Sequence, residues 1–332
     1  MSRLIFLSVF VLHALSAVAA DPPAKVTGIV VFDNCDSQYQ GKEEYKDNLT
    51  LLDSAGELSF RVSGFNNAES IGSGRMIATD STRSCIWVIE NVGHRIRRFD
   101  FAGKETLSIH GVKGSAIAVD PETGNLWALV GEGHIGKGKT VVYDVKGKEV
   151  KSHDIPGWDI AYDRKTKAFW IADSKLTKVS AANGETIFSC EISTWCSSSL
   201  DIDSRDGSVW VAVRQHRDVI GSSNRLFKFD ATGKGLAAVD FGEKFPFRVS
   251  VDQKDGSVWV AMMRSSVRCF SAAGDAEAEF PVEALSVQVD PADGDVWVVT
   301  STETQRMTPR GELTKRVKHA GKTSQAWIAP LE

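Results

Sequence analysis

The chain has 332 residues, of which 42% are hydrophobic and 25% charged, and a formal net charge of −4 at pH 7. This mildly acidic balance contains no basic block, so we expect no nucleic acid partner, because phosphate backbones attract clustered Lys and Arg. A chain of this length can bury a large core in one or two domains.

The first 20 residues have the pattern of a secretory signal peptide. Arg3 gives a positive start, an apolar run extends from Leu4 to Leu15, and small residues follow as far as Ala20. We expect cleavage after Ala20, so that the protein is secreted or periplasmic. Cleavage removes one basic residue, Arg3, which leaves 38 basic and 43 acidic residues and changes the formal net charge from −4 to −5. A membrane anchor is the alternative, but this run is shorter than the about 20 apolar residues that a bilayer requires. No later stretch is long and apolar enough for a span.

Two segments after the signal match parts of a repeat that fills the rest of the chain. Residues 28–31 (GIVV) match residues 207–210 (GSVW), and residues 48–56 (NLTLLDSAG) match residues 224–233. We expect them to form the second and third strands of a unit that has no first strand at this end of the chain.

Six repeats follow, each built around a tryptophan, at spacings of 38 to 49 residues. An apolar strand ending in Asp and a short turn precede each tryptophan, and a second turn with Gly comes after it. Asp caps such turns through its side chain, and Gly accepts their positive φ. Four short antiparallel strands in one repeat are one β-propeller blade. The tryptophans are Trp87, Trp127, Trp170, Trp210, Trp259 and Trp297, and the turn aspartates are Asp80, Asp120, Asp163, Asp203, Asp252 and Asp290.

The C-terminal residues 324–330 (SQAWIAP) match the first strand of a repeat with nothing after it. Joined to the N-terminal strands they complete one blade, which predicts an all-β propeller of seven four-stranded antiparallel blades in one domain, residues 21–332. Sharing the closing blade between the two ends of the chain pairs an edge that would otherwise expose backbone groups. The alternative is six blades with an irregular N-terminal segment.

Residues 86–103 (IWVIENVGHRIRRFDFAG) resemble a blade of the NHL and streptogramin-lyase-like propeller superfamily, and the other repeats share its skeleton. The resemblance implies the fold and a range of functions that includes ligand-binding proteins, interaction scaffolds, lactonases and lyases. The lyases use histidines with a magnesium ion, and the lactonases use a Glu, Asn and Asp set around a central divalent ion. Glu90 and Asn91 stand where an acidic–His pair would indicate a lyase, so we carry over no catalytic residue.

The strand order predicts which face binds a ligand. Turns between strands one and two, and three and four, are short and share one face, which we call the short-turn face. The other connections include the long segments 34–47, 131–139 and 214–223, and they lie on the opposite, long-loop face. Long loops on a rigid scaffold concentrate binding residues.

Eight residues near that face are candidates for ligand binding. We expect Arg75, Trp158, Ser199 and Arg248 nearest the central channel. There the two guanidinium groups could hold a carboxylate or sulfate, with Trp158 as an aromatic wall. The alternatives are that the arginines pair with carboxylates of neighbouring blades and that the histidines are solvated loop residues rather than metal ligands or general bases. The candidates are Arg75, Glu90, His94, His134, Trp158, Arg214, His216 and Arg248.

The chain has five cysteines, and the odd number leaves at least one thiol free or paired with another chain. Cys190 and Cys196 are close in sequence and are candidates for a disulfide in an oxidising compartment. No C-x-x-C is present, which argues against a thiolate zinc site.

These observations favour an exported, monomeric propeller that binds a small molecule, glycan or protein on its long-loop face. The alternative is a lyase or lactonase that uses a divalent metal and acidic and His groups at the channel mouth. A third hypothesis is an assembly scaffold.

Overall fold

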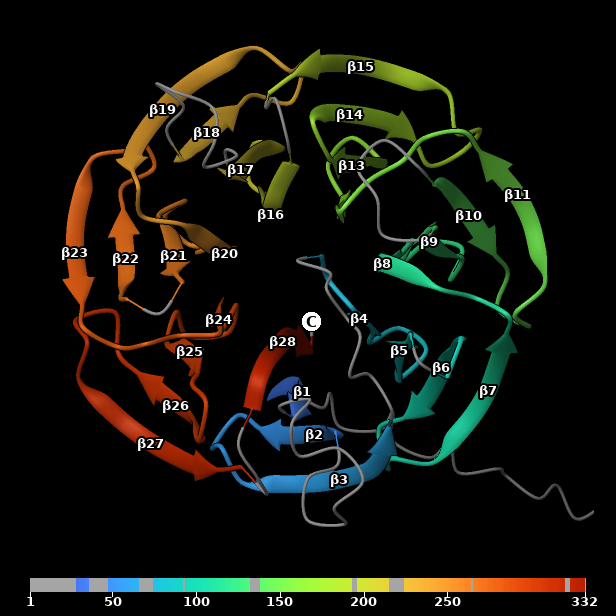
Figure 1. Ribbon diagram of the computed structural model, residues 1–332, viewed down its shortest axis with the longest axis horizontal. Helices are drawn as coiled ribbons and strands as arrows, with labels where there is room; N and C mark the ends of the chain where they lie inside the picture. The colour runs from blue at the N-terminus through green and yellow to red at the C-terminus, as the bar shows by residue number, and fades with distance from the viewer. Residues whose placement is uncertain are drawn as a thin grey trace, which may run out of the picture.

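The computed structural model describes residues 28–35, 47–65, 74–91, 93–131, 138–192, 196–214, 224–263, 265–319 and 323–331. These residues form seven four-stranded antiparallel sheets that stand around a central axis as the blades of a propeller (Figure 1). The seven-blade prediction is therefore confirmed. The expected signal peptide, residues 1–20, lies outside the described residues. Within the described ranges, no helix has the length and apolar character needed to cross a membrane.

Six blades are built from four strands in chain order, with the first strand at the axis and the fourth at the rim. Blade 1 contains β4 (Ile77–Asp80), β5 (Cys85–Glu90), β6 (Arg95–Asp100) and β7 (Glu105–His110); blade 2 contains β8 (Gly114–Val119), β9 (Leu126–Val130), β10 (Lys139–Tyr143) and β11 (Glu149–His153); blade 3 contains β12 (Asp159–Asp163), β13 (Ala168–Ala172), β14 (Lys175–Ser180) and β15 (Thr186–Glu191). Blade 4 contains β16 (Cys196–Asp203), β17 (Ser208–Arg214), β18 (Asn224–Phe229) and β19 (Gly235–Gly242); blade 5 contains β20 (Pro246–Val251), β21 (Val258–Met262), β22 (Val267–Phe270) and β23 (Ala276–Phe280); blade 6 contains β24 (Ser286–Val289), β25 (Val296–Val299), β26 (Glu303–Met307) and β27 (Leu313–Lys318).

The six repeated tryptophans all lie on second strands and are at most 2% exposed. Blades stand face to face around the ring, so both faces of a second strand are buried, which explains continuous apolar runs instead of alternation. Trp127, for example, stacks on Phe169 of the next blade with ring centroids 4.4 Å apart. The tryptophans therefore pack neighbouring blades against each other.

Four third strands carry a cation that joins its blade to the next one. Each cation lies over the tryptophan ring of its own blade. It also donates a hydrogen bond to a backbone carbonyl in the turn between the third and fourth strands of the following blade. One side chain thus makes both a cation–π contact and a bond to the neighbouring blade. The contacts are Arg98 over Trp87 to Val145 O, Lys178 over Trp170 to Ala231 O, Lys228 over Trp210 to Ala272 O, and Arg306 over Trp297 to Ser54 O.

The closing blade combines both ends of the chain, as predicted. Its order is β28 (Thr323–Leu331), β1 (Gly28–Cys35), β2 (Asp47–Asp53) and β3 (Leu58–Phe65). The antiparallel pairing of β28 with β1 runs from Gly28 opposite Leu331 to Cys35 opposite Thr323. Trp327 is buried on β28, and Pro330 O accepts a 2.8 Å hydrogen bond from Thr79 Oγ1 of blade 1.

Removal of residues 322–332 tests this closure. We expect the melting temperature to fall by roughly 10 °C or more, because the truncation unpairs β1 and removes the buried Trp327. Thermal unfolding and resistance to a protease measure the effect. The control is Leu313→Ser, at a side chain 43% exposed on the outer strand β27. Unchanged resistance of the truncated chain would count against the closure.

A half-buried histidine, His319, lies between blade 6 and the closing strand β28. The His319 ring contacts Thr304 Oγ1 at 2.9 Å through Nε2 and Thr323 Oγ1 at 3.1 Å through Nδ1. Burial, with a further contribution from the positive charge of Arg61, lowers the pKa of His319 to about 4. The folded protein therefore holds the neutral imidazole, whereas the unfolded chain protonates near the ordinary value of 6.5.

The lowered pKa of His319 makes stability depend on pH. Its contribution is fully present above pH 6.5 and is lost as pH falls from 6.5 through 4, because the unfolded chain then binds more protons. We expect His319→Gln to reduce the loss of unfolding free energy between pH 7 and pH 4.5 by about 2 kcal/mol relative to wild type. Urea titrations of both proteins at the two pH values measure it. Equal losses in the two proteins would show that His319 is not the group responsible.

Candidate functional site

The first strands surround the channel, and their inner edges have no neighbouring strand. Backbone N–H groups on an unpaired, buried edge need acceptors. In blades 4, 5 and 6, side chains of the preceding blade supply them. The bonds are Leu200 N to Asp159 Oδ2 at 2.9 Å, Val249 N to Ser199 Oγ at 3.3 Å, Val251 N to Asp201 Oδ2 at 2.9 Å and Val289 N to Ser250 Oγ at 2.9 Å.

Gly74 and Arg75, which precede β4 of blade 1, lie at the channel and contact three other blades. Arg75 N donates to Asp159 Oδ1 of blade 3 at 2.9 Å, and Arg75 O accepts from Ile117 N of blade 2 at 2.8 Å. Gly74 O accepts a hydrogen bond from Trp327 Nε1 of the closing blade. Figure 1 shows β4 reaching toward the centre of the ring. We call Gly74 and Arg75 the channel plug.

Only glycine fits at position 74. A Cβ there would lie 1.7 Å from Trp158 O and 2.6 Å from Ser115 O, both of them backbone atoms that have little room to retreat. The absence of a side chain therefore allows the plug to approach the backbone of blades 2 and 3 closely.

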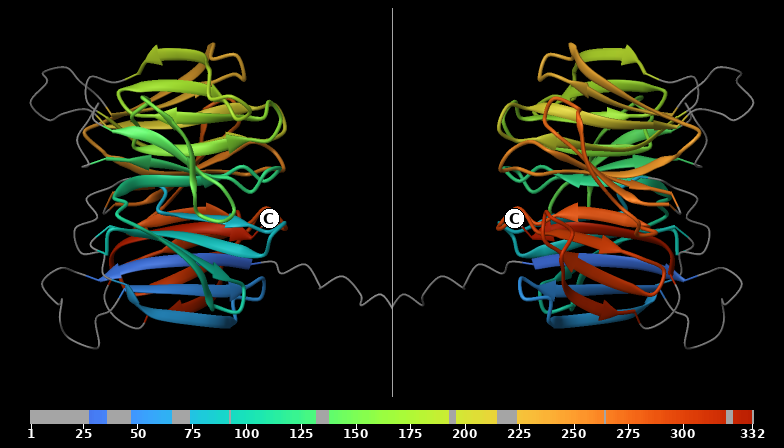
Figure 2. Two further views of the ribbon diagram at one scale, coloured as in Figure 1. Left: turned by 90° about the vertical axis from the view of Figure 1, so that its right-hand side faces the viewer. Right: turned by 90° about the vertical axis from the view of Figure 1, so that its left-hand side faces the viewer.

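A cavity of about 390 Å³ lies in the channel beyond the plug. Its walls come from the ends of the first strands and the following turns, among them Pro121, Ser204 and Gln253, so it opens on the short-turn face, where the C-terminus also lies (Figure 2). The described cavity thus lies opposite the long-loop face that the sequence favoured. The segments 36–46, 132–137 and 215–223, which make up most of the long loops, lie outside the described residues.

The cavity exists because three blades place alanine where the others have larger residues. In blades 1, 2 and 3 the first-strand residue opposite the tryptophan is Ala78, Ala118 or Ala161. The corresponding residues in blades 4, 5 and 6 are Asp201, Ser250 and Gln288. One side of the channel is therefore wide and apolar, and the polar groups lie on the other.

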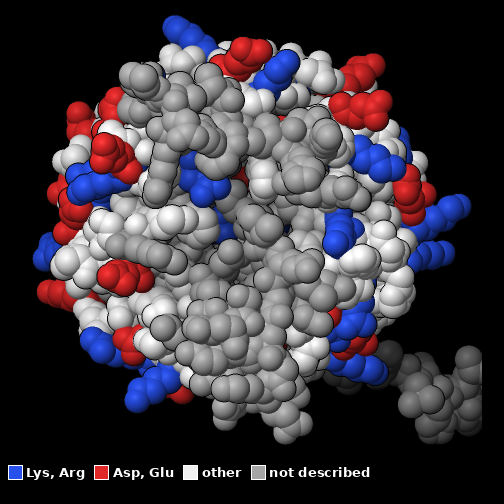
Figure 3. Space-filling model, viewed as in Figure 1, with Lys and Arg blue, Asp and Glu red and all other residues white. Residues whose placement is uncertain are grey.

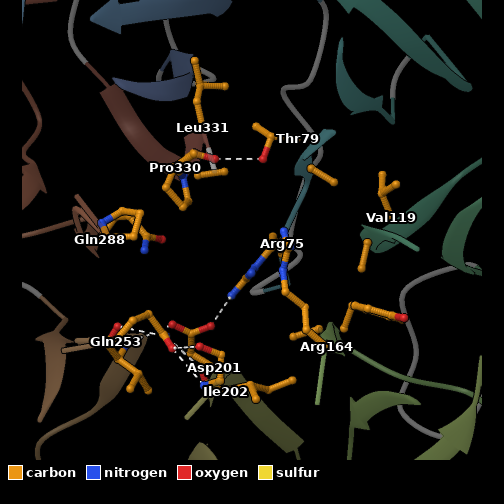
Figure 4. A pocket seen from close by; sticks show the side chains of 18 of the residues that line it. Arg75, Thr79, Val119, Arg164, Asp201, Ile202, Gln253, Gln288, Pro330 and Leu331 are labelled. Carbon is orange, nitrogen blue, oxygen red and sulfur yellow. Dashed lines mark hydrogen bonds and ion pairs between the residues drawn. The ribbon is translucent and has the colours of Figure 1, made fainter. Parts of the chain in front are cut away.

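An ion pair lies on the cavity wall next to the plug. Arg75 Nη2 is 3.4 Å from Asp201 Oδ1 and donates to Leu200 O at 3.2 Å, and Figure 4 shows the Arg75 side chain pointing across the channel to Asp201. The two side chains are 26% and 14% exposed, so both are reached from the cavity. Burial raises the pKa of Asp201, and Arg75 opposes that shift. Arg164, an exposed side chain, also lines the cavity.

Most other polar side chains of the cavity wall are bonded within the protein. Thr79 donates to Pro330 O, Gln253 Nε2 donates to Ile202 O at 2.9 Å, and Gln253 Oε1 accepts from Ser204 N and Oγ. Gln288 Nε2 donates to Ser250 Oγ at 3.0 Å. These bonds hold the polar side chains of the wall in place.

Arg75 also borders a small void of about 20 Å³ on the far side of the plug, together with Arg248, Asp159 and Ser199. The Arg248 guanidinium lies 4.4 Å from the ring centroid of Phe247, and burial lowers its pKa to about 9, with Asp159 opposing the shift. Arg214 and Arg75 lower the pKa of Arg248 further, so three arginines gather here. Figure 3 shows Lys and Arg side chains near the centre of the long-loop face.

The structure brings Arg75, Arg214 and Arg248 together, and Trp158 lies against Gly74 beside them. Glu90 is buried and pairs with Arg95 Nε at 2.7 Å and Arg97 Nη1 at 3.5 Å, which gives it a structural partner on its own blade. His94 has a φ of 49° in the turn between β5 and β6, and its carbonyl accepts from Val112 N. Trp158 is half-buried and contributes its backbone to the plug. His134 and His216 lie outside the described residues.

One of the two cysteine candidates for a disulfide can be described. Cys190 has a free thiol that packs on the core between blades 3 and 4 with Phe188 and Ile192, and the side chain of Cys196 lies outside the described residues. Among the residues that can be described, no three His, Cys, Asp or Glu side chains form a group that could hold a metal ion.

The residues that sequence reasoning missed are Asp201, Arg164 and the three alanines. A signal was present, because the residue two positions before each turn Asp departs from the repeat: Ala78, Ala118, Ala161, Asp201, Ser250 and Gln288. Such departures show where the ring is not uniform. The crossing of the channel by Gly74 had no comparable local signal.

Comparisons with known proteins support the fold and leave the family open. No model of a known protein family matches the sequence, and no curated protein matches it either. Among solved structures, hydrazine synthase of Kuenenia stuttgartiensis is similar with a TM-score of 0.58, covering 82% of this chain and 90% of that one at 12% identity. At that identity the similarity shows a shared β-propeller fold alone.

Gly74→Ala tests the plug. We expect a loss of about 3 kcal/mol in unfolding free energy, because the added methyl group meets two carbonyl oxygens and displaces the hydrogen bonds of Gly74 and Arg75. Urea unfolding measures it. The control is Gly235→Ala, where the nearest atom to an added Cβ is 4.0 Å away. Equal stability of the two variants would contradict the close approach at Gly74.

Proposed function

We propose that this protein is an exported propeller that binds a small molecule in the channel cavity. The observation that carries the proposal is the cavity of about 390 Å³ in the central channel beside the plug. That volume is within the range of small-molecule sites, roughly 300–1,000 Å³, which are mostly apolar with a few oriented polar groups.

The rigidity of the surroundings supports a binding site. The cavity is lined by residues of blades 1 to 6 and of the closing blade, and side-chain bonds join blade 3 to blade 4, blade 4 to blade 5 and blade 5 to blade 6. A ligand held there would be surrounded on all sides except the short-turn face. Preformed sites of this kind lose little conformational entropy on binding.

The export part of the proposal is supported by the pattern of residues 1–20, and the placement among NHL and streptogramin-lyase-like propellers by residues 86–103. The long-loop face, with the arginine group around Arg248, remains a second surface on which a glycan or protein partner could bind. A lyase or lactonase activity would appear as consumption of the bound molecule that a chelator abolishes.

Filling the cavity tests this proposal. Ala118→Leu and Ala78→Leu, on neighbouring blades, each add bulk at the wall. A small-molecule library is screened on wild-type protein by thermal shift, and each hit is titrated by calorimetry on the variants. We expect each hit to bind at least tenfold more weakly to a variant that keeps the wild-type fold by circular dichroism.

Hits that bind the folded variants as tightly as wild type would place the ligand elsewhere. A library with no hits on wild type would also contradict the proposal. The matched control is Leu236→Ala, at a side chain that is 51% exposed on the outer strand β19 and far from the cavity lining.

A further inference from the structure

We propose that two copies of this protein pair edge to edge through the outer strand β19 of blade 4, antiparallel and across a twofold axis. The partner is therefore a second copy of the chain, in place of the monomer expected from the sequence. No residue of β19 lines the channel cavity, so this surface is separate from the proposed ligand site. A twofold contact uses the same patch on both copies, which must be complementary to itself.

The outer edge of β19 lies at the rim of the propeller (Figure 1). On its inner side the strand pairs with β18, from Gly242 opposite Asn224 to Gly235 opposite Phe229. Among the strands that the structure describes, none pairs with the other side. Alternate residues of an edge strand direct their N–H and C=O groups away from the sheet, so a second strand can bond to them.

Strand β19 has the longest apolar stretch of the outer edges. Proteins discourage pairing between edges by placing charged side chains on them. Of the seven outer strands, all of which the structure describes, only β19 has five successive residues that are glycine or apolar, 235–239 (GLAAV). By contrast, β23 carries Glu277 and Glu279, and β27 carries Lys315, Arg316 and Lys318.

Small side chains leave the backbone of this edge open to a second strand. Ala237 and Val239 pack on the core between blades 4 and 5. Leu236 and Ala238 point to the other face of the strand and are exposed, Leu236 at 51%. A second strand alongside covers part of this apolar surface, which favours the pairing.

The two ends of β19 carry opposite charges, which makes the strand complementary to itself. Lys234 precedes the strand and Asp240 lies near its end, and both are exposed. Antiparallel pairing centred on Ala237 places Lys234 opposite Asp240 of the second copy. Asp240 also accepts from Gly242 N at 2.7 Å, and its Oδ2 is 3.8 Å from Arg225 Nε in its own blade. The contribution of the new pair is therefore to select the partner and the register.

The same pairing of other outer strands brings like charges together. When the centre is again the fourth residue after the turn glycine, β11 meets its copy with Lys151 against Lys151, and β27 with Lys315 against Lys315. Strand β15 places Glu185 against Glu191. Like charges directly opposite each other destabilise a strand pair. Strand β19 is thus the outer strand whose pairing with itself joins opposite charges and has no charge between them.

Sedimentation velocity tests the pairing directly. We expect the purified protein to change from monomer to dimer between about 1 and 100 μM, because a contact made by one pair of strands is small and gives weak association. A wild-type protein that stays monomeric up to about 100 μM would overturn the proposal.

Charge variants identify the strand and its direction. Lys234→Glu and Asp240→Lys each place like charges opposite each other in the dimer, and we expect each to weaken dimerisation about tenfold or more. An equimolar mixture of the two variants again has opposite charges at both ends, so it should dimerise as wild type does. Variants that stay weak when mixed, or that dimerise alone as tightly as wild type, would contradict the antiparallel β19 contact.

A lysine in the middle of the strand blocks the edge. Ala238→Lys adds a charge to the exposed face of β19 and should weaken dimerisation about tenfold or more. The matched control is Ser152→Lys, at the equivalent exposed position of β11, which should change nothing. Circular dichroism checks that both variants keep the fold. A dimer that both variants weaken equally, or that neither weakens, would place the contact elsewhere and reject β19.

Discussion

The inner edge of each blade is the constraint on which this propeller depends. A four-stranded blade leaves one strand beside the axis with backbone groups that no fifth strand can pair, and water is largely kept from them by the ring itself. The chain meets this need with polar side chains of the preceding blade, such as Asp159, Ser199 and Ser250. Most of the polarity of the channel is thus structural, and the Arg75–Asp201 pair is reached from the cavity.

Farther from the axis, side chains of one blade again bond to the next blade. A tryptophan on the second strand provides apolar area, and a cation on the third strand lies over the ring and bonds to the next blade. Lys178 shows the cost of burying such a cation, since Asp163 pairs with it at 3.1 Å where both are buried. Because these side chains contact two blades at once, each blade that lines the cavity is fixed in position by its neighbours.

The blades could be predicted from the sequence because their signals are local. A turn Asp, a tryptophan a few residues later and a Gly in the next turn lie within one repeat, and the composite closing blade followed from matching incomplete repeats at the two ends. The site could be predicted only in part. Arg75 and Arg248 were placed near the axis correctly, but Glu90 has partners on its own blade, and the cavity opens on the face with short turns. The plug depends on contacts between Gly74 and blades 2 and 3, far along the chain, which no repeat pattern encodes.

The composite closing blade also dictates when the protein can fold. Strand β1 is made first, and its axial edge stays unpaired until β28, near the other end of the chain, is available. Long-range pairing of this kind makes folding slow, and an uncovered strand edge is prone to wrong partners in the meantime. If the chain crosses a membrane with its N-terminal end first, the propeller therefore stays incomplete during transport. The ring closes only after β28 has crossed and paired with β1.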